Sequence, residues 1–205
     1  MELENLHVAC GRVYAEEYLN IDIAPRGLSF ALKENEVVKL PKKTNTFVMK
    51  VNPESKLPSK ENSLNVIYHS HFLEHLPKQT GNAFLHNCFD CLRDGGKMRI
   101  VVPDFNLWAN NYVNDNSEFF KWYSDNFHKG HNLTKLEIFN RMLYSGHYCM
   151  YDFETLSKVL TKIGFKNITS GVWGQSDIIP SINDLETPNS KRKPESLIVE
   201  SEKLL

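Results

Sequence analysis

The sequence predicts an α/β fold in which a mainly parallel sheet is covered by helices. Short runs rich in β-branched and aromatic residues alternate with stretches of helical periodicity, and glycine, proline or asparagine often bounds the runs. The chain has 205 residues, which is the usual length of one domain. We therefore expect residues 1–205 to form a single domain.

Seven segments have the composition and length of strands. They are Leu6–Cys10, Tyr18–Ile23, Thr46–Val51, Asn65–His69, Lys97–Val102, Asn167–Trp173 and Ser196–Glu200. Only Arg12–Glu17 separates the first two, whereas a crossover that includes a helix needs about ten or more residues. We expect an extended loop or a single turn there, so one patch of the sheet should lack its usual helix.

Two helices are legible from their periodicity and their ends. Gln79–Arg93 carries apolar residues at helical spacing and is followed by Asp-Gly-Gly at 94–96, a strong helix stop. Asp152 is placed to cap a helix over Phe153–Ile163, and Gly164 can supply the left-handed residue after it. Cys88 and Cys91 form a CxxC inside the first helix, where thiol redox chemistry is not expected, so we interpret both as structural.

Residues 105–148 follow the fifth predicted strand and are rich in large aromatic side chains. In an open α/β sheet, ligands bind beyond the carboxyl ends of the strands. A segment inserted after a strand end is therefore well placed to cover a site, and we expect a roof on the substrate side. The alternative is plain packing of two or three additional helices.

Composition excludes several function classes. The formal net charge is −1, from 24 basic and 25 acidic residues, which argues against a large nucleic-acid surface. No apolar run is as long as a membrane span, and the first residues lack the pattern of a signal peptide. Four cysteines do not make a disulfide framework, so we expect a reducing, cytoplasmic location, with neither nucleic acid nor membrane as a partner.

Two signals at predicted strand ends point to a ligand. Val8-Ala9-Cys10-Gly11 ends the first strand, and its glycine would let backbone approach a ligand. The loop lacks the further glycines of a pyrophosphate site, and an ordinary tight turn is the alternative. Asp22 ends the second strand, where a carboxylate can bind a ribose diol. The alternative is a loop aspartate that forms a turn.

The most specific signal is His69-Ser70-His71-Phe72-Leu73-Glu74-His75-Leu76 after the fourth predicted strand. Residues 71–75 match H-x-x-E-H, an inverted zinc-protease motif. On a helix, His71 and His75 would share one face, as zinc ligands require. A third ligand is not evident and the β/α layout is foreign to such sites, so we expect no metal and keep a zinc hydrolase as the third hypothesis.

The chain resembles the class I S-adenosylmethionine-dependent methyltransferases, and in particular a group of small methyltransferases of type 11. Five blocks carry the resemblance in order along almost the whole chain. They are LHVACG with LNID, HSHFLEHL, Leu92–Asp104, Met150–Phe165 and Pro194–Glu200. The resemblance implies a Rossmann-like three-layer sandwich whose sheet has seven strands, the last antiparallel.

The resemblance also implies S-adenosylmethionine as cofactor. The residues it places at the cofactor are Ala9, Cys10, Gly11, Asp22, Ile23, Asn52, His69 and Ser70. Our candidates for the general base are His71, His147 and Asp104, because a hydroxyl acceptor would benefit from one. The alternatives are that His71 bonds backbone or caps a helix, that Asp104 caps the next helix, and that His147 packs in the roof.

We therefore expect a methyltransferase for a small molecule, with a sugar or a sugar-containing metabolite as one class of acceptor; a homodimer stays open. The main rival is a binding or scaffold protein whose methyltransferase fold has lost catalysis. Three departures from the family pattern support the rival. Ala9 replaces a glycine, and Asn52 and Asn65 replace aspartates.

Overall fold

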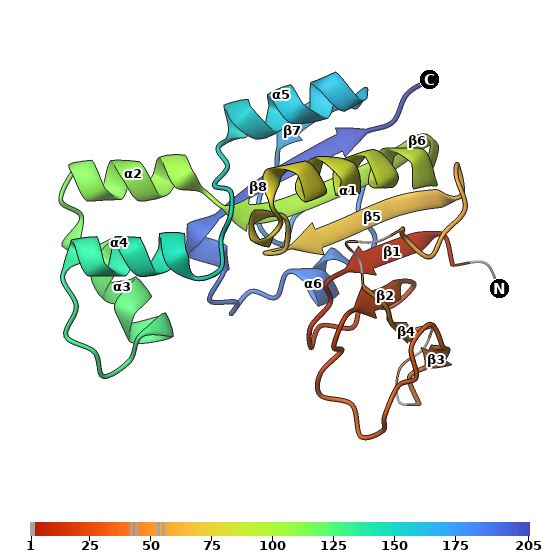
Figure 1. Cartoon of the computed structure of the whole chain (residues 1–205), viewed down its shortest axis with the longest axis horizontal. Helices are drawn as coiled ribbons and strands as arrows, with labels where there is room; N and C mark the ends of the chain where they lie inside the picture. The colour runs from red at the N-terminus through yellow and green to blue at the C-terminus, as the bar shows by residue number, and fades with distance from the viewer. Residues whose placement is uncertain (1–2, 42, 44, 53, 55) are drawn as a thin grey trace.

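A single twisted sheet forms the centre of the computed structural model, which describes residues 3–41, 43, 45–52, 54 and 56–205 (Figure 1). Its strand order is β3-β4-β2-β1-β5-β6-β8-β7. The bounds are β1 Asn5–Val8, β2 Leu19–Asp22, β3 Val37–Lys39, β4 Phe47–Lys50, β5 Leu64–Ser70, β6 Leu92–Pro103, β7 Lys166–Ser170 and β8 Ser196–Glu202. The five strands from β4 to β6 in this order run parallel, and β8 is antiparallel to both of its neighbours.

The described residues thus form eight strands, one more than predicted. The additional strand β3 is antiparallel to β4 at one edge of the sheet. It has three residues, and the two outer ones are exposed, so it lacks the buried apolar run that marks a strand in a sequence. The other seven strands form where the sequence predicted them, and the last one, β8, is antiparallel as expected.

The short connection between β1 and β2 contains no helix, as its length predicted. Asn20 on β2 is fully buried, and its side chain holds this connection in place through hydrogen bonds. Its Oδ1 accepts the amide of Ala15 at 3.0 Å, and its Nδ2 donates to the carbonyl of Ala15 at 3.1 Å and to that of Phe47 at 2.9 Å. These bonds satisfy backbone groups of the connection and of β4.

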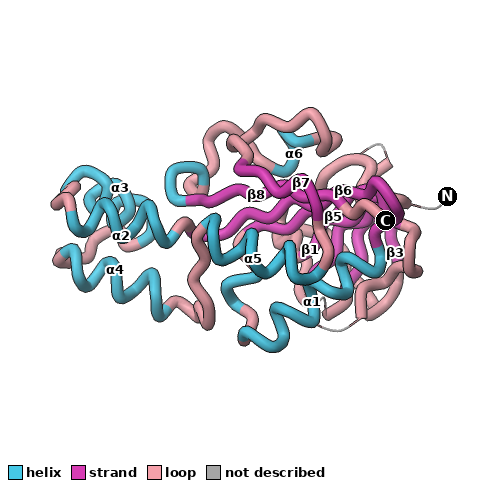
Figure 2. The backbone as a smooth tube through the Cα atoms, turned by 90° about the horizontal axis from the view of Figure 1, so that it is seen from above, coloured by secondary structure: helices cyan, strands magenta, loops and turns pink. Residues whose placement is uncertain are grey.

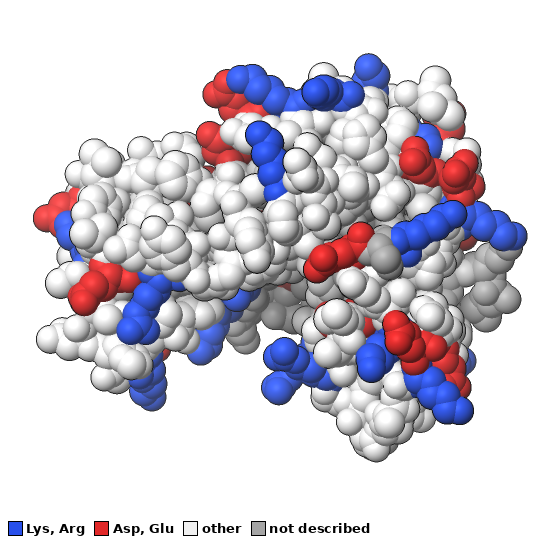
Figure 3. Space-filling view, in the orientation of Figure 1, with Lys and Arg blue, Asp and Glu red and all other residues white. Residues whose placement is uncertain are grey.

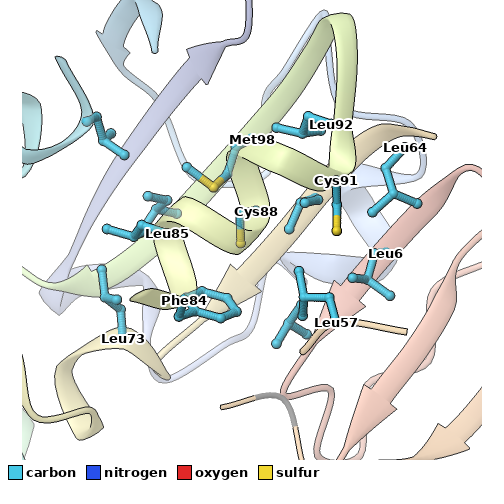
Figure 4. Packing of buried hydrophobic residues seen from close by; sticks show 14 of the residues in the cluster. Leu6, Leu57, Leu64, Leu73, Phe84, Leu85, Cys88, Cys91, Leu92 and Met98 are labelled. Carbon is cyan, nitrogen blue, oxygen red and sulfur yellow. The ribbon is translucent and has the colours of Figure 1, made fainter. Parts of the chain in front are cut away.

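One face of the sheet is covered by α1 (Lys78–Cys91) and α5 (Phe153–Ile163), as Figure 2 shows. Asp152 caps α5 by accepting the amide of Thr155 at 2.7 Å, and Gly164 ends the helix with φ of 125°. Helix α1 ends at Cys91, earlier than predicted, because residues 92–96 already belong to β6. Leu85 and Cys88 of α1 lie among the apolar side chains of the main core (Figure 4).

The opposite face has a smaller core and little helix. The short helix α6 (Ile182–Leu185) and the chain before it cover this face (Figure 2). Ile179 and Leu185 pack there against Tyr68 and Tyr18, and the Tyr18 hydroxyl donates to the carbonyl of Pro180 at 3.0 Å. The expected patch of sheet without a full crossover helix lies here.

A buried ion network fastens this second face to the sheet. The guanidinium of Arg99 on β6 is fully buried and donates to both carboxylate oxygens of Glu186, at 2.7 and 2.6 Å. It also donates to Glu200 on β8 at 2.6 Å and to the carbonyl of Val172 at 2.8 Å. One side chain thereby joins two strands and the segment that ends in α6.

Three helices stand apart from the sheet beyond the carboxyl end of β6 (Figure 1). They are α2 (Phe105–Val113), α3 (Ser117–Phe127) and α4 (Lys135–Tyr144), and we call residues 105–144 the helical lobe. The lobe has a core of its own, in which Trp108, Phe120 and Met142 are almost fully buried. Two 3-10 helices, Leu73–His75 and Lys193–Glu195, precede α1 and β8.

Charged side chains of both signs are interspersed on the face of the molecule seen in Figure 3. Among the described residues, no helix has the length and apolar character that crossing a membrane requires.

Candidate active site

The loop that follows β1 is bonded to the end of β2. The amide of Cys10 donates to the carbonyl of Ile21 at 3.0 Å, and the amide of Gly11 donates to Oδ2 of Asp22 at 2.9 Å. Ala9 and Gly11 both have φ of 55°. A Cβ added to Gly11 would meet no described atom within 4 Å, so the space beside the Asp22 carboxylate is open at this loop.

Asp22 lies where β1, β2 and β4 end together. Its Oδ1 accepts the amide of Ala24 at 2.8 Å, and its carbonyl accepts the amide of Val51, the residue after β4, at 2.9 Å. A carboxylate has about four acceptor positions, so the two backbone bonds leave capacity for two hydroxyl donors. Ile23, the next residue, is 58% exposed and offers an apolar surface beside the carboxylate.

Asn52 follows β4 at the same edge of the sheet. It is half-buried, and its Oδ1 accepts the amide of Glu54 at 3.0 Å. This contact is a local turn of the kind that asparagine favours. Asn52 is therefore held in place near Asp22 by its own loop.

His69 and Ser70 end β5, next to β1 in the sheet. The His69 side chain points into the main core, where its ring packs edge-on against Phe72 and Phe84. It is fully buried, and burial lowers its pKa to about 3. His69 is thus closed to solvent as a whole, whereas Ser70, the last residue of β5, is half-buried.

His71 turns the chain away from β5. Its φ of 49° is left-handed, and its amide donates to the carbonyl of Val101 on β6 at 2.8 Å. The helical H-x-x-E-H arrangement that the zinc-hydrolase alternative requires does not form: residue 71 is not helical, and only Leu73–His75 form a 3-10 turn. His71 and His75 do not share one face of an α-helix, since no α-helix forms there.

Four side chains nevertheless gather around this turn, and we call His71, Glu74, His75 and His147 the histidine–glutamate cluster. Nδ1 of His71 lies 3.3 Å from Oε1 of Glu74, and Nε2 of His75 lies 3.9 Å from the same oxygen. The ring centroids of His75 and His147 are 4.6 Å apart. Burial raises the pKa of Glu74 and lowers the pKa of His71 to about 3 and of His147 to about 4.

Asp104 follows β6 directly and begins α2. Its Oδ1 accepts the amides of Asn106 and Leu107 at 3.0 and 3.2 Å, so it caps the helix. Both bonds use the same oxygen, and burial raises the pKa of this half-buried carboxyl. Asp104 therefore caps α2, which was one alternative from the sequence, and its second carboxylate oxygen takes no part in the cap.

Sequence reasoning missed three contributors to this region. Ser196 and Arg192 lie beside His71, and Oγ of Ser196 is 2.9 Å from Nε2 of His71. Tyr14 lies near the Gly11 loop, where its hydroxyl donates to the carbonyl of Arg26 at 2.6 Å. Ser196 is 125 positions from His71 in the chain, so no local pattern could connect them. A tyrosine three residues after Gly11 was the only available signal for Tyr14.

Comparison with known proteins decides the family. Residues 4–170 match the family model of the methyltransferase domain. The chain belongs to the methyltransferase-domain family. This membership, together with the fold, confirms the expected class I S-adenosylmethionine-dependent methyltransferase and its cofactor, S-adenosylmethionine.

Solved methyltransferases share the fold at low sequence identity. A SAM-dependent methyltransferase from Archaeoglobus fulgidus is 16% identical, with a TM-score of 0.56 over 97% of this chain and 85% of that one. Another from Thermotoga maritima is 13% identical, with a TM-score of 0.54 over 99% and 83%. A phosphoethanolamine N-methyltransferase of Haemonchus contortus, in complex with phosphomonomethylethanolamine and S-adenosylhomocysteine, is 10% identical, with a TM-score of 0.55 over 98% and 49%. Among curated proteins, no significant match was found.

The residues at the carboxyl edge suit the cofactor of this methyltransferase. The open position above Gly11 gives room for a ligand against the backbone, and Asp22 has acceptor capacity for the two hydroxyls of a ribose. Ala9 has a left-handed backbone, which glycine adopts without the steric cost of a Cβ.

Proposed function

We propose that the methyltransferase binds S-adenosylmethionine at the carboxyl edge of β1, β2, β4 and β5 and methylates a small molecule. The observation that carries this proposal is the bond between the Gly11 amide and the Asp22 carboxylate beneath an open position. This contact fixes the loop and the ribose acceptor relative to each other before a ligand arrives, which lowers the entropy lost on binding.

The proposed contacts follow the sheet edge. The 9–11 loop would contact the ligand through backbone, and Asp22 would accept the ribose hydroxyls beside the apolar surface of Ile23. Asn52 would serve the adenine through its amide group. His69 and Ser70 would border the methionine part, with the half-buried Ser70 as the more accessible of the two. The proposed cofactor residues are Ala9, Cys10, Gly11, Asp22, Ile23, Asn52, His69 and Ser70.

The acceptor would lie between this edge and the helical lobe. The lobe begins directly after Asp104 at the end of β6, which supports its assignment as a substrate-side insertion within one domain. A sugar or a sugar-containing metabolite is the acceptor class we propose to test first, and the near-neutral charge argues against a polyanion. All four cysteines are free, which supports a reducing, cytoplasmic location.

S-adenosylmethionine, when bound, supplies a methyl group on a sulfonium that needs no further activation. The task of the chain is to align the acceptor atom, and alignment contributes several kcal/mol or more, on the order of 7–11 in favourable cases. A hydroxyl acceptor also gives up a proton, and a positioned base typically contributes about 10²–10⁴-fold in rate.

Of the three candidate bases, the geometry favours Asp104. Both ring nitrogens of His71 face protein groups, Ser196 on one side and Glu74 on the other, and its side chain is 8% exposed. His147 lies beside Glu74 and His75, within the cluster. Asp104 keeps one carboxylate oxygen outside its cap, and its raised pKa makes it a stronger base than an exposed aspartate.

The rival scaffold hypothesis loses one of its supports. Asn65 lies at the start of β5, at the opposite end of the strand from His69 and Ser70, and its side chain donates to Glu4. Its replacement of an aspartate is therefore remote from the proposed site. Ala9 keeps a glycine-like backbone, which leaves Asn52 as the remaining departure at the sheet edge.

Calorimetric titration with S-adenosylmethionine and S-adenosylhomocysteine tests the cofactor site. We expect one site per chain, and Asp22→Ala should weaken S-adenosylhomocysteine binding by about 1.5–3 kcal/mol, the loss of charge-assisted hydrogen bonds. Asp125→Ala, at an exposed position of α3, is the matched control and should bind as the unchanged protein does. Absence of binding in the unchanged protein would favour the scaffold.

Asp104→Asn tests the base, because asparagine caps a helix about as well as aspartate but does not accept a proton. Small hydroxylated compounds, sugars included, are first screened for S-adenosylhomocysteine formation. With a compound that reacts, the variant should turn over at least about 100-fold more slowly, while its stability and its S-adenosylhomocysteine affinity stay unchanged. Equal turnover would exclude Asp104 as the base and return His71 and His147 to consideration, each tested by its alanine variant.

A further inference from the structure

The proton positions in the histidine–glutamate cluster follow from its hydrogen bonds. Nδ1 of His75 lies 3.0 Å from the carbonyl oxygen of Gly146. A carbonyl only accepts, so Nδ1 carries the hydrogen and Nε2 keeps a lone pair. That Nε2 is the atom 3.9 Å from Oε1 of Glu74.

His147 has the opposite tautomer, with the same consequence. Its Nε2 lies 3.2 Å from Oγ of Ser145, and the Ser145 hydroxyl donates its own hydrogen to the carbonyl of Met142 at 2.9 Å. Nε2 of His147 must therefore be the donor, which leaves the lone pair on Nδ1. This Nδ1 is buried, and no described residue bonds it.

His71 repeats the pattern of His147. Its Nε2 lies 2.9 Å from Oγ of Ser196, and that hydroxyl donates to the carbonyl of Arg192 at 2.7 Å. The lone pair of His71 is thus on Nδ1, 3.3 Å from Oε1 of Glu74. Three imidazoles present lone pairs toward this cluster.

Glu74 and the three histidines therefore face one another with hydrogen-bond acceptors only. The Glu74 side chain is fully buried, and neither carboxylate oxygen has a hydrogen-bond donor among the described residues. A buried carboxylate without donors is costly, and lone pairs that face it add repulsion. Such a set is stabilised when a cation occupies the space that the lone pairs share.

We propose that a divalent transition-metal ion of the zinc class binds between Glu74, His75 and His147. One ligand atom from each of these three side chains lies within 4.8 Å of the other two. Ligands at about 2.0–2.1 Å from a tetrahedral zinc are about 3.3 Å apart, so modest side-chain rotation closes the site. Imidazole and carboxylate are ligands that such ions take.

The surroundings orient the ligands as metal sites require. Gly146 and Ser145 accept the outward N–H groups of His75 and His147, which fixes the tautomer that leaves the metal-facing nitrogen free. His71 lies beside Glu74 as a further neighbour of the carboxylate. The His75 side chain is 40% exposed, so an ion can enter from solvent and keep a water ligand on that side.

The ion would join two distant segments. Glu74 and His75 precede α1, whereas His147 follows α4, and the amides of Tyr148 and Cys149 already donate to the Glu74 carbonyl at 2.8 and 3.2 Å. Metal binding would strengthen this junction, at which the chain returns from the helical lobe to the sheet. The expected role is structural.

Titration of chelator-treated protein with Zn²⁺ and with Co²⁺ tests the site. We expect one ion per chain, a Co²⁺ absorption band typical of tetrahedral nitrogen and oxygen ligands, and a rise in Tm on adding Zn²⁺. His147→Ala should weaken Zn²⁺ binding at least 10-fold and abolish the rise in Tm. The exposed His86→Ala and His131→Ala are matched controls that should bind as the unchanged protein does.

His75→Ala is the second ligand variant, because its partly exposed position is the less damaging one to truncate. Stoichiometric binding that both ligand variants lose and both controls keep supports the site. No binding above the level of the ligand variants, or equal binding in all five proteins, would overturn it. The cluster would then be held together by a shared proton. S-adenosylhomocysteine affinity, measured in parallel, reports on the proposed function separately, since neither ligand lies at the cofactor edge.

Discussion

The amide nitrogen of Gly11 lies 2.9 Å from Oδ2 of Asp22, across the ends of two neighbouring strands. The same carboxylate holds the amide of Ala24 through its other oxygen. One aspartate thus organises the backbone of two loops at the edge where the cofactor of this methyltransferase is expected. A substitution at either end of this contact should therefore affect ligand binding and stability by different mechanisms.

Gly11→Val should abolish S-adenosylhomocysteine binding while the protein still folds. The left-handed φ of 55° costs a residue with a Cβ about 1–2 kcal/mol, and no described atom blocks the new side chain. The valine would fill the space that the ligand needs. Calorimetry and denaturant unfolding measure the two effects.

Gly130→Val is the control, because Gly130 also has a left-handed φ, 86°, and open surroundings, but lies in the helical lobe. It should lose similar stability and bind S-adenosylhomocysteine as before. Unchanged affinity in Gly11→Val would refute the placement of the ligand above this loop.

Ala9→Gly should stabilise the protein by about 0.5–1 kcal/mol. Ala9 has φ of 55°, and glycine adopts this backbone without the steric penalty of a Cβ. Ala83→Gly, at an exposed position inside α1, should have the opposite sign and destabilise by about 1 kcal/mol. Chemical unfolding of both variants gives the comparison, and a loss of stability in Ala9→Gly would contradict the strain.

His69 should make the protein sensitive to acid. Its pKa is about 3 in the folded protein because of burial, against 6.5 without it, so the unfolded chain binds more protons between these values. Stability should therefore fall as the pH is lowered below about 6.5, and the contribution at pH 5 is about 2 kcal/mol. Unfolding curves at pH 8 and pH 5 measure it.

His69→Leu should remove about that much of the difference between the two pH values. The exposed His86→Leu should leave the difference as it is in the unchanged protein. If both variants keep the full acid sensitivity, the buried ring of His69 is not its source.

Arg99→Met should destabilise the protein by about 3–5 kcal/mol, because it leaves the buried carboxylate of Glu186 without its partner. Lys121→Met, in the exposed pair with Asp125 on α3, should cost less than about 1 kcal/mol. Denaturant unfolding distinguishes the two. Adding Glu186→Gln to Arg99→Met should restore part of the loss, and strict additivity would show that the two side chains are not coupled.

Local signals in the sequence determined most of the elements. Asp152 and Gly164 bound α5 as predicted, since caps depend on residues within one helical turn. The strand candidates and the short connection before β2 were also correct, because burial on a sheet leaves apolar runs of characteristic length. Strand β3 was not predicted, because an exposed three-residue edge strand leaves no apolar run in the sequence.

Tertiary structure alone determined where the key side chains point and which distant residues they contact. The sequence placed His69 at the sheet edge, but the packing of α1 on β5 turned its ring toward Phe84 and into the core. His71 and His75 could share one face only on a helix, and His71 has a left-handed backbone instead. His75 meets Gly146, 71 positions away, only because the helical lobe folds back to the sheet. Periodicity reports the neighbours of a residue along the chain, whereas such contacts depend on how distant elements pack.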